Sequence, residues 1–400
     1  MNKKQLFILA VLAAALAGVI FAMVYRPGRN PENGTSTTRN KPTTTQEATT
    51  VPPPSVVTFM AVGDNLIHNS IFKQAKARAR GGAEYDFAPA YEGVRDIIAR
   101  ADLALINQET SIAAAVAAVS SYPLFCSPPE VGDAVYDLGF RAIQVANNHV
   151  LDKREAGVLA HLAYWDSKSG VCAFGAYRDG EDFATPHIKT VGGITFGFVG
   201  ATFSYNGLVL PQSSPLVLPR LEQEELLKLA INIAREHADV VVVCPHWGNE
   251  DSTRVSDEQR SLARKFVEWG ADMVIGNHPH VLQTMEFLDR PTGGRAFVAY
   301  SLGNFISAQS AAPNLVGGVL ELTVTMDNTD GTVTITSPRF LPVVTQYEAG
   351  YANVRLIPWA RYTPALGSAH GVKRKDSRFG YNYIERLLRE IIPEEILVLG

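Results

Sequence analysis

Short apolar runs that each end in a polar segment recur along this chain, and they restrict its fold more than any other feature. The runs are rich in β-branched and aliphatic residues, which is typical of buried strands. They occupy residues 57–62, 103–106, 142–145, 240–244, 273–275 and 296–300. Because a polar segment follows each run directly, we expect polar side chains at the carboxyl ends of six strands.

Helical patterns separate several of these strands. Apolar side chains recur at helical spacing over residues 221–237, and a second helix is predicted to begin at Ser256, where Gln259 completes a capping box. Strands that alternate with helices predict an α/β fold with helices on both faces of a sheet, and ligands bind at the carboxyl ends of such strands. We therefore expect the polar segments to lie close together in space.

The last part of the chain has a different pattern. Alternating residues 320–325, a turn at residues 328–331 and a second alternating run at residues 332–336 predict a β-hairpin. Residues 383–391 carry apolar side chains at helical spacing and predict a closing amphipathic helix.

The first 54 residues differ in composition from the rest of the chain. Uncharged residues 6–25 come close to the ~20 apolar residues that a helix needs to cross a bilayer, and they predict a membrane anchor. A cleaved signal peptide is the alternative, because Ala15 and Ala17 form a small-x-small cleavage pattern. The Thr- and Pro-rich residues 27–54 predict a disordered stalk. We therefore expect a single-pass protein of the cell membrane whose globular part is extracytoplasmic.

Charge and cysteine content exclude two classes of protein. The formal net charge of -4 gives no basic excess, so we expect no nucleic-acid partner. The three cysteines cannot all pair, and we expect no disulfide framework.

The polar segments carry the side-chain types that bind divalent cations. Carboxylate, carboxamide and imidazole groups suit manganese, iron or zinc, and two such ions near ~4 Å apart can activate a water between them. A lone Asp or His at a strand end is more often a turn former or a hydrogen-bonded polar residue. Here, however, His278 and His280 have the i, i+2 spacing that directs two side chains the same way on extended backbone. The candidates are Asp64, Glu109, Asn148, His149, His246, His278 and His280.

Taken in order, these segments resemble the motif set of the CapA family of poly-γ-glutamate capsule synthesis proteins, which is similar to the calcineurin-like metallophosphoesterases. The resemblance covers residues 57–345 and is carried by six motifs. They are Gly63-Asp64, Asn107-x-Glu109, Asn147-Asn148-His149 with Asp152, His246-Trp247-Gly248-x-Glu250, Gly276-x-His278-Pro279-His280, and Ser301-Leu302-Gly303-Asn304.

The resemblance implies a metallophosphoesterase-like multilayer α/β sandwich and a role for each candidate residue. Asp64 and His280 would bind a first metal, and Glu109 would stand where those enzymes use a bridging aspartate. Asn148, His246 and His278 would bind a second metal, and His149 would be the catalytic acid. We expect the substrate-binding residues to be His68, Asn107, Glu250 and Asn304.

The chain also departs from the phosphoesterase pattern. Leu66 occupies the position where those enzymes have a metal-binding histidine, and His68 stands nearby. Two interpretations of His68 stay open, a metal ligand or a polar residue that lines the site. Glu109 is longer than aspartate, so two metals would be held differently, or only one would bind tightly.

The resemblance implies a membrane-anchored protein that acts in the synthesis, export or trimming of an anionic capsule polymer. The expected activity is metal-dependent hydrolysis, with His149 as general acid. The alternative is a non-catalytic, metal-containing subunit that binds polymer within a capsule synthase complex. The expected partners are the polymer, the membrane and membrane-embedded synthase subunits.

We expect four segments along the chain. Residues 1–26 would be a cytoplasmic N-terminus and transmembrane anchor, and residues 27–54 a linker. Residues 55–345 would form the CapA-type domain, and residues 346–400 a C-terminal extension that ends in the closing helix.

Overall fold

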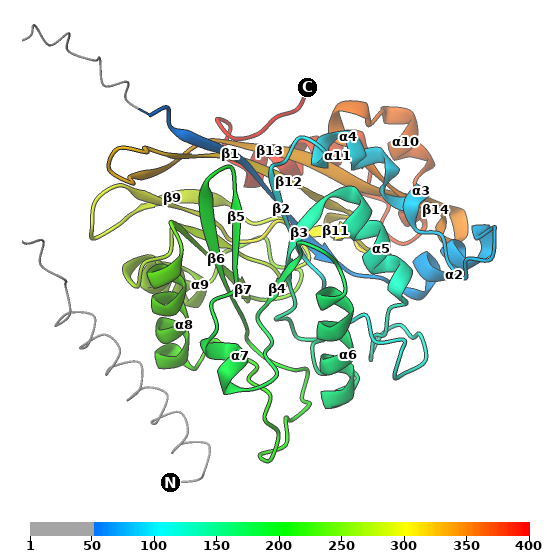
Figure 1. The fold of residues 1–400 in the computed structure, drawn as a ribbon. Coiled ribbons are helices and arrows are strands. Elements are labelled where there is room, and N and C mark those ends of the chain that lie inside the picture. The colour runs from blue at the N-terminus through cyan, green and yellow to red at the C-terminus, as the bar shows by residue number, and fades with distance from the viewer. Residues whose placement is uncertain (1–51) are drawn as a thin grey trace, which may run out of the picture. The chain divides into compact units, whose positions relative to one another are not determined.

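Two β-sheets lie against each other, and helices cover their outer faces (Figure 1). This computed structural model describes residues 52–400. Within that range the fold is α/β with four layers, ordered helix, sheet, sheet, helix. The predicted α/β class and its multilayer arrangement are therefore confirmed.

The larger sheet has eight strands, in the order β14-β13-β12-β1-β2-β3-β4, with β11 paired to β1. Strands β1 to β4 are parallel, whereas β12, β13 and β14 are antiparallel to their neighbours. The strands are β1 (Ser55–Asn65), β2 (Leu103–Asn107), β3 (Phe140–Gln144), β4 (Cys172–Phe174), β11 (Asn304–Ile306), β12 (Val316–Met326), β13 (Val333–Glu348) and β14 (Ala352–Pro358).

The smaller sheet has six strands, in the order β5-β6-β7-β8-β10-β9. Its four central strands are parallel, and the edge strands β5 and β9 are antiparallel to them. The strands are β5 (Ile188–Val191), β6 (Ile194–Thr202), β7 (Val240–His246), β8 (Met273–Ile275), β9 (Met285–Asp289) and β10 (Arg295–Ala299).

Helices α8 and α9 pack on the smaller sheet, while α5 and α6 contact β3 and β4 of the larger one. The capping box predicted at Ser256 is present, and its side chain accepts a hydrogen bond from the backbone of Gln259 at the start of α9. The α-helices are α2 (Asn69–Arg78), α3 (Ala88–Tyr91), α4 (Arg95–Ile98), α5 (Pro129–Leu138), α6 (Arg154–Asp166), α7 (Gly180–Ala184), α8 (Glu224–His237), α9 (Asp257–Glu268), α10 (Pro364–Ala369) and α11 (Tyr381–Ile391). The 3-10 helices are η1 (Glu92–Val94), η2 (Pro313–Leu315), η3 (Ala349–Tyr351), η4 (Trp359–Arg361) and η5 (Gly371–Arg374).

Strand β7 shows why its sequence is apolar throughout. Val240 and Val242 point into the core between the sheets, whereas Val241 and Val243 point into the core beneath the outer helices. Successive side chains of a strand face opposite sides, so a strand buried on both faces needs an unbroken apolar run. Each fully buried valine of this kind contributes about 1.5–3 kcal/mol.

The sequence pattern at the C-terminal end is confirmed in part. Strands β12 and β13 form the predicted antiparallel hairpin, and α11 is the predicted closing helix, with Ile384 and Leu388 buried. The boundary drawn between residues 345 and 346 is wrong, because it falls inside β13 and the next strand, β14, pairs with β13. Residues 346–400 therefore complete the larger sheet and its core instead of forming an extension.

The prediction of a single-pass membrane protein needs correction. Among residues 52–400, the helices are all too short or too polar to cross a bilayer. The segment on which that prediction rested, residues 6–25, lies outside the described residues, as does most of the expected linker at residues 27–54.

Candidate metal centre

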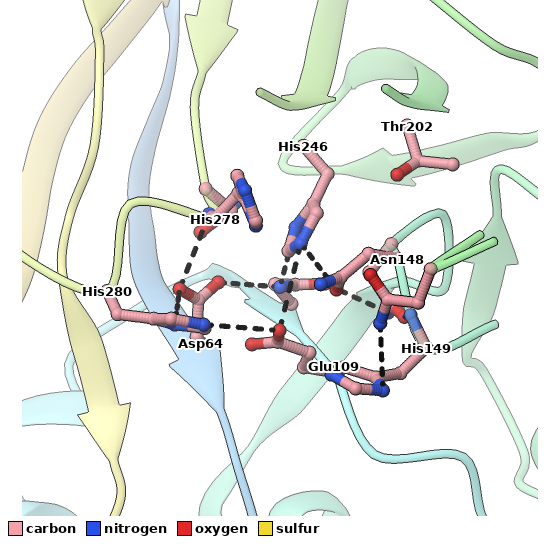
Figure 2. A network of polar contacts seen from close by, with 12 residues as sticks. Asp64, Glu109, Asn148, His149, Thr202, His246, His278 and His280 are labelled. Atoms are coloured by element: carbon pink, nitrogen blue, oxygen red, sulfur yellow. Dashed lines mark hydrogen bonds and ion pairs between the residues drawn. The ribbon is translucent and has the colours of Figure 1, made fainter. Parts of the chain in front are cut away.

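Polar residues at or just after the carboxyl ends of β1, β2, β3, β7 and β8 meet at one place between the two sheets (Figure 2). Each of the residues brought together there is at most 5% exposed. We call this group the polar centre. It consists of Asp64, Glu109, Asn148, His149, His246, His278 and His280.

A glycine lets the backbone come close beside Asp64. The amide of Asp64 donates to the carbonyl oxygen of Gly303 over 3.0 Å, and Asp64 is aligned with Asn304 in the pairing of β1 with β11. A Cβ atom at Gly63 would overlap the same Gly303 oxygen, so only glycine permits this approach. The fold thus brings Asp64 and Asn304 to the same edge of the centre.

Asp64 and His280 form one half of the polar centre. The Nδ1 atom of His280 lies 3.0 Å from Asp64 Oδ2 and 3.1 Å from Asn304 Oδ1, and Asn107 donates to Asp64 Oδ1 over 2.7 Å. Burial alone would lower the pKa of His280, but the Glu109 and Asp64 carboxylates outweigh it and raise that pKa to about 10. In the metal-free protein, His280 therefore holds a proton between two acids.

Glu109 lies in the middle of the polar centre without a hydrogen-bond partner. Its side chain is 0% exposed, and neither carboxylate oxygen has a donor. Its Oε1 atom is 3.7 Å from Nε2 of His246 and also 3.7 Å from Nε2 of His280. These separations exceed hydrogen-bond lengths but suit ligands of one ion, which lie roughly 3–4 Å apart when each bond is about 2.1 Å.

The surroundings of Glu109 also disfavour its charge. Burial, together with the nearby Asp64 carboxylate, raises the pKa of Glu109 well above its usual value. A buried carboxylate without a donor costs free energy unless a cation or a proton compensates it. A cation held together with Asp64 and His280 would therefore compensate the Glu109 carboxylate.

His246 and His278 form the other half of the centre with Asn148. The Nε2 atom of His246 lies 3.0 Å from Asn148 Oδ1, and Nδ1 of His278 has no partner. Burial lowers the pKa of His246 well below its usual value and that of His278 to about 3. Both imidazoles are thus neutral, which is the form that binds metal ions.

The backbone that carries His278 and His280 differs from the expected extended conformation. Both residues have positive φ angles, 101° and 59°, which non-glycine residues adopt rarely and at a cost. Backbone bonds to the neighbouring loop hold this conformation, since Trp247 donates to Asn277 and Asp251 donates to Pro279 over 2.9–3.0 Å. The extended backbone expected from the i, i+2 spacing is therefore wrong, although both imidazoles do reach the centre.

Asp152, to which we assigned no role from the sequence, orients His149. Its Nδ1 atom lies 2.8 Å from Oδ2 of Asp152, and the same oxygen accepts the amide of Phe125 over 2.7 Å. The Phe125 ring packs edge-on against the imidazole, with ring centroids 4.7 Å apart. Asp152 therefore fixes the ring and leaves Nε2 of His149 free for another group.

The four expected substrate-binding residues fall in different surroundings. Asn107 and Asn304 are buried and bonded to Asp64 and His280 respectively. Glu250 is exposed and reaches the centre from the solvent side.

His68 is half-buried and bonded to backbone. Its Nδ1 atom accepts the amide of Ala308 over 3.2 Å, and burial lowers its pKa to about 4. It belongs to neither of the residue groups in the described chain that are able to hold a metal ion. This geometry favours a residue that lines the site.

Three residues near the centre were missed from the sequence. Thr202 ends β6, the ring of Phe203 lies 4.3 Å from that of His278, and Nδ2 of Asn206 lies 3.4 Å from Nδ1 of His149 (Figure 2 includes Thr202). The signal that was available is the apolar run in residues 194–199 ahead of Thr202.

Two groups of side chains in residues 52–400 have the geometry to hold a cation. One contains Asp64, Glu109 and His280, and the other contains Glu250, His278 and His280. Within each group the ligand atoms lie within 4.8 Å of one another. Oxygen and nitrogen donors of this mixture fit divalent manganese, iron or zinc.

Comparison with known proteins places the chain in a family. The model of the family described as "Bacterial capsule synthesis protein PGA_cap" matches residues 58–309, more than half of the 400 residues. "PGA biosynthesis protein CapA" of Bacillus subtilis (strain 168) is 33% identical over 174 residues, which cover 43% of this chain and 44% of that protein. "Capsule biosynthesis protein CapA" of Bacillus anthracis is 31% identical over 186 residues, which cover 45% and 43%. The matched stretch thus spans less than half of either relative.

Two solved structures are also similar. A phosphatase from Mycoplasma pneumoniae has 12% identity and a TM-score of 0.43, over 73% of this chain and 95% of that chain. A putative 5'-nucleotidase from Staphylococcus aureus has 15% identity and a TM-score of 0.43, over 76% and 54%. The family model and the two Bacillus relatives confirm the CapA resemblance, and this chain belongs to the PGA_cap family of bacterial capsule synthesis proteins.

Proposed function

We propose that this protein is a metal-dependent hydrolase that acts on an anionic capsule polymer, poly-γ-glutamate, during its synthesis, export or trimming. One observation carries the proposal. Glu109 is fully buried without a donor, and its Oε1 atom lies 3.7 Å from a nitrogen of His246 and of His280. A cation on each side would satisfy this carboxylate.

The two halves of the polar centre offer separate sets of ligands. Asp64 and His280 would hold one cation, Asn148, His246 and His278 would hold the other, and Glu109 would contact both. Divalent cations held there would supply Lewis-acid chemistry to a polymer bond beside them. The buried surroundings strengthen such electrostatic effects, because few water molecules screen them.

His149 is the residue that we assign to proton transfer. Its Nδ1 atom faces Asp152, so its Nε2 atom is available to give a proton to a leaving group. Asp152 would stabilise the imidazole in the required orientation, and the packed Phe125 ring would restrict its motion.

The name of the Bacillus subtilis relative, a PGA biosynthesis protein, supports the choice of substrate, and the name of the Bacillus anthracis relative supports a role in capsule biosynthesis. Poly-γ-glutamate carries one carboxylate per unit and amide links between units. A cationic centre would attract the carboxylates of the polymer and act on its amide links.

The test uses the purified full-length protein with poly-γ-glutamate and, separately, an aryl phosphate ester. We expect polymer chains to shorten, cleavage to stop when a chelator removes the metal, and cleavage to return when Mn²⁺ is restored. Cleavage of the ester alone would support a hydrolase but contradict poly-γ-glutamate as its substrate. A metal-loaded protein that cleaves neither compound would contradict the hydrolase.

A second candidate function is a non-catalytic subunit that binds polymer within a capsule synthase complex. The observation that favours it is Leu66, an apolar residue only 3% exposed, where phosphoesterases have a metal-binding histidine. Under this function the protein would bind poly-γ-glutamate in a metal-dependent manner without shortening it. The same assay, with polymer retention measured alongside cleavage, separates the two functions.

A further inference from the structure

We propose that Glu250 is a further ligand of the cation centre, which it approaches from the solvent side between His278 and His280. This inference rests on the proposed metal centre. It gives Glu250 a different role from the substrate contact expected from the sequence.

Glu250 lies close to both His278 and His280. One of its carboxylate oxygens and one nitrogen of each of His278 and His280 lie within 4.8 Å of one another. The Nδ1 atom of His278 is buried and has no partner.

The loop that carries Glu250 is held firmly beside the histidines. Gly248 and Asp251 have positive φ angles of 81° and 62°, which turn the chain on both sides of Glu250. The amide of Asp251 donates to the carbonyl oxygen of Pro279 over 2.9 Å, and Asn314 donates to the side chain of Asp251. Pro279 lies between the two histidines in sequence, so this bond fixes Glu250 next to both.

Few side chains are available to hold a cation beside His280. Both candidate groups contain His280, one together with the buried Asp64 and Glu109 and the other together with His278 and the exposed Glu250. Asp64, Glu109 and His280 alone would give a cation three side-chain ligands, whereas divalent ions of this kind commonly have four or more ligands. Leu66 supplies no donor where a histidine was expected, and Glu250 makes up the deficit.

The experiment compares metal binding by the full-length protein and three variants. Glu250→Gln and Glu250→Ala remove the proposed ligand, while Glu258→Gln removes an exposed carboxylate in the first turn of α9 and serves as the matched control. Metal content is measured by mass spectrometry after dialysis against Mn²⁺, and the affinity for Mn²⁺ by titration calorimetry. We expect both Glu250 variants to bind Mn²⁺ roughly 10–100-fold more weakly and Glu258→Gln to bind as the wild type does.

A folding defect is separated from a ligand effect by thermal unfolding in the presence of a chelator. Glu250 is exposed, so the metal-free variants should unfold at the wild-type temperature. Wild-type affinity in Glu250→Gln would overturn this inference alone. A wild-type protein that binds no Mn²⁺ would overturn the proposed metal centre as well. If Glu250→Gln binds Mn²⁺ more weakly but the wild-type protein hydrolyses neither substrate, Glu250 is supported as a metal ligand. Only the proposed hydrolase activity is then contradicted.

Discussion

The Oε1 atom of Glu109 lies 3.7 Å from Nε2 of His280, too far for a hydrogen bond, and both residues are buried. An ordinary buried ion pair would close this gap and satisfy both groups. The open spacing is instead what two ligands of a shared cation require, and it has consequences that measurements on the protein can check.

Metal affinity should depend on pH through His280. Burial would lower its pKa, but Glu109 and Asp64 raise it to about 10 in the metal-free protein, so the ring carries a proton at neutral pH. A ligand must be deprotonated, and a cation therefore displaces this proton. Raising the pH favours binding, and we expect the Mn²⁺ affinity to rise about tenfold per unit between about pH 6.5 and 8.5.

Titration calorimetry in two buffers with different ionisation enthalpies checks this prediction. The difference between the two heats gives the number of protons released, which should be at least one. A pH-independent affinity without proton release would contradict the displacement of a proton from His280 by the metal.

Loss of one imidazole from the centre should lower metal content and activity together. We expect His278→Ala to retain less Mn²⁺ after dialysis, because the remaining ligands exchange the ion more readily. The control is His237→Ala, which removes an exposed imidazole at the end of α8. Equal metal content in the two variants would remove His278 from the ligand set.

Loss of the proposed acid should lower activity without lowering the metal content. His149→Ala should keep its metal while turnover slows by roughly 10²–10⁴-fold, the usual range for a lost general acid. Asp152→Asn should also keep its metal, and it should slow turnover and shift the pH profile, because an amide cannot stabilise a charged imidazole. Unchanged hydrolysis in His149→Ala would assign the proton transfer to another group.

The close approach at Gly63 should be essential for stability. A Cβ there would overlap the Gly303 carbonyl, so we expect Gly63→Ala to lower the free energy of unfolding by about 3 kcal/mol. In Gly380→Ala the new Cβ would have its nearest neighbour 4.0 Å away, and this control should unfold like the wild type. Urea unfolding of the metal-free proteins gives both values, and equal values would refute the steric argument.

The sequence was most informative where strands are buried on both faces. The valine run of β7 and its polar end at His246 could be predicted, because burial on both sides leaves an unbroken apolar run. Strand β6 was missed because Gly197 and Gly200 interrupt it. Side chains there would crowd the neighbouring structure, since a Cβ at Gly197 would lie 3.1 Å from Cβ of Ala234 and one at Gly200 would lie 2.9 Å from Cα of Gly175.

Tertiary contacts account for the other differences. The positive φ angles of His278 and His280 depend on bonds to a loop about 30 residues earlier in the chain, which local spacing does not reveal. The role of Asp152 depends on the amide of Phe125, which is equally remote from the motif that contains His149.

The most direct test of the bridging role of Glu109 is an anomalous difference map from crystals of the full-length protein grown with Mn²⁺. We expect two peaks about 2.0–2.2 Å from the Glu109 carboxylate, one beside Asp64 and His280 and the other beside Asn148 and His246. A map in which no ion contacts Glu109, at saturating Mn²⁺ and with its side chain clearly visible, would contradict the metal centre proposed for this protein.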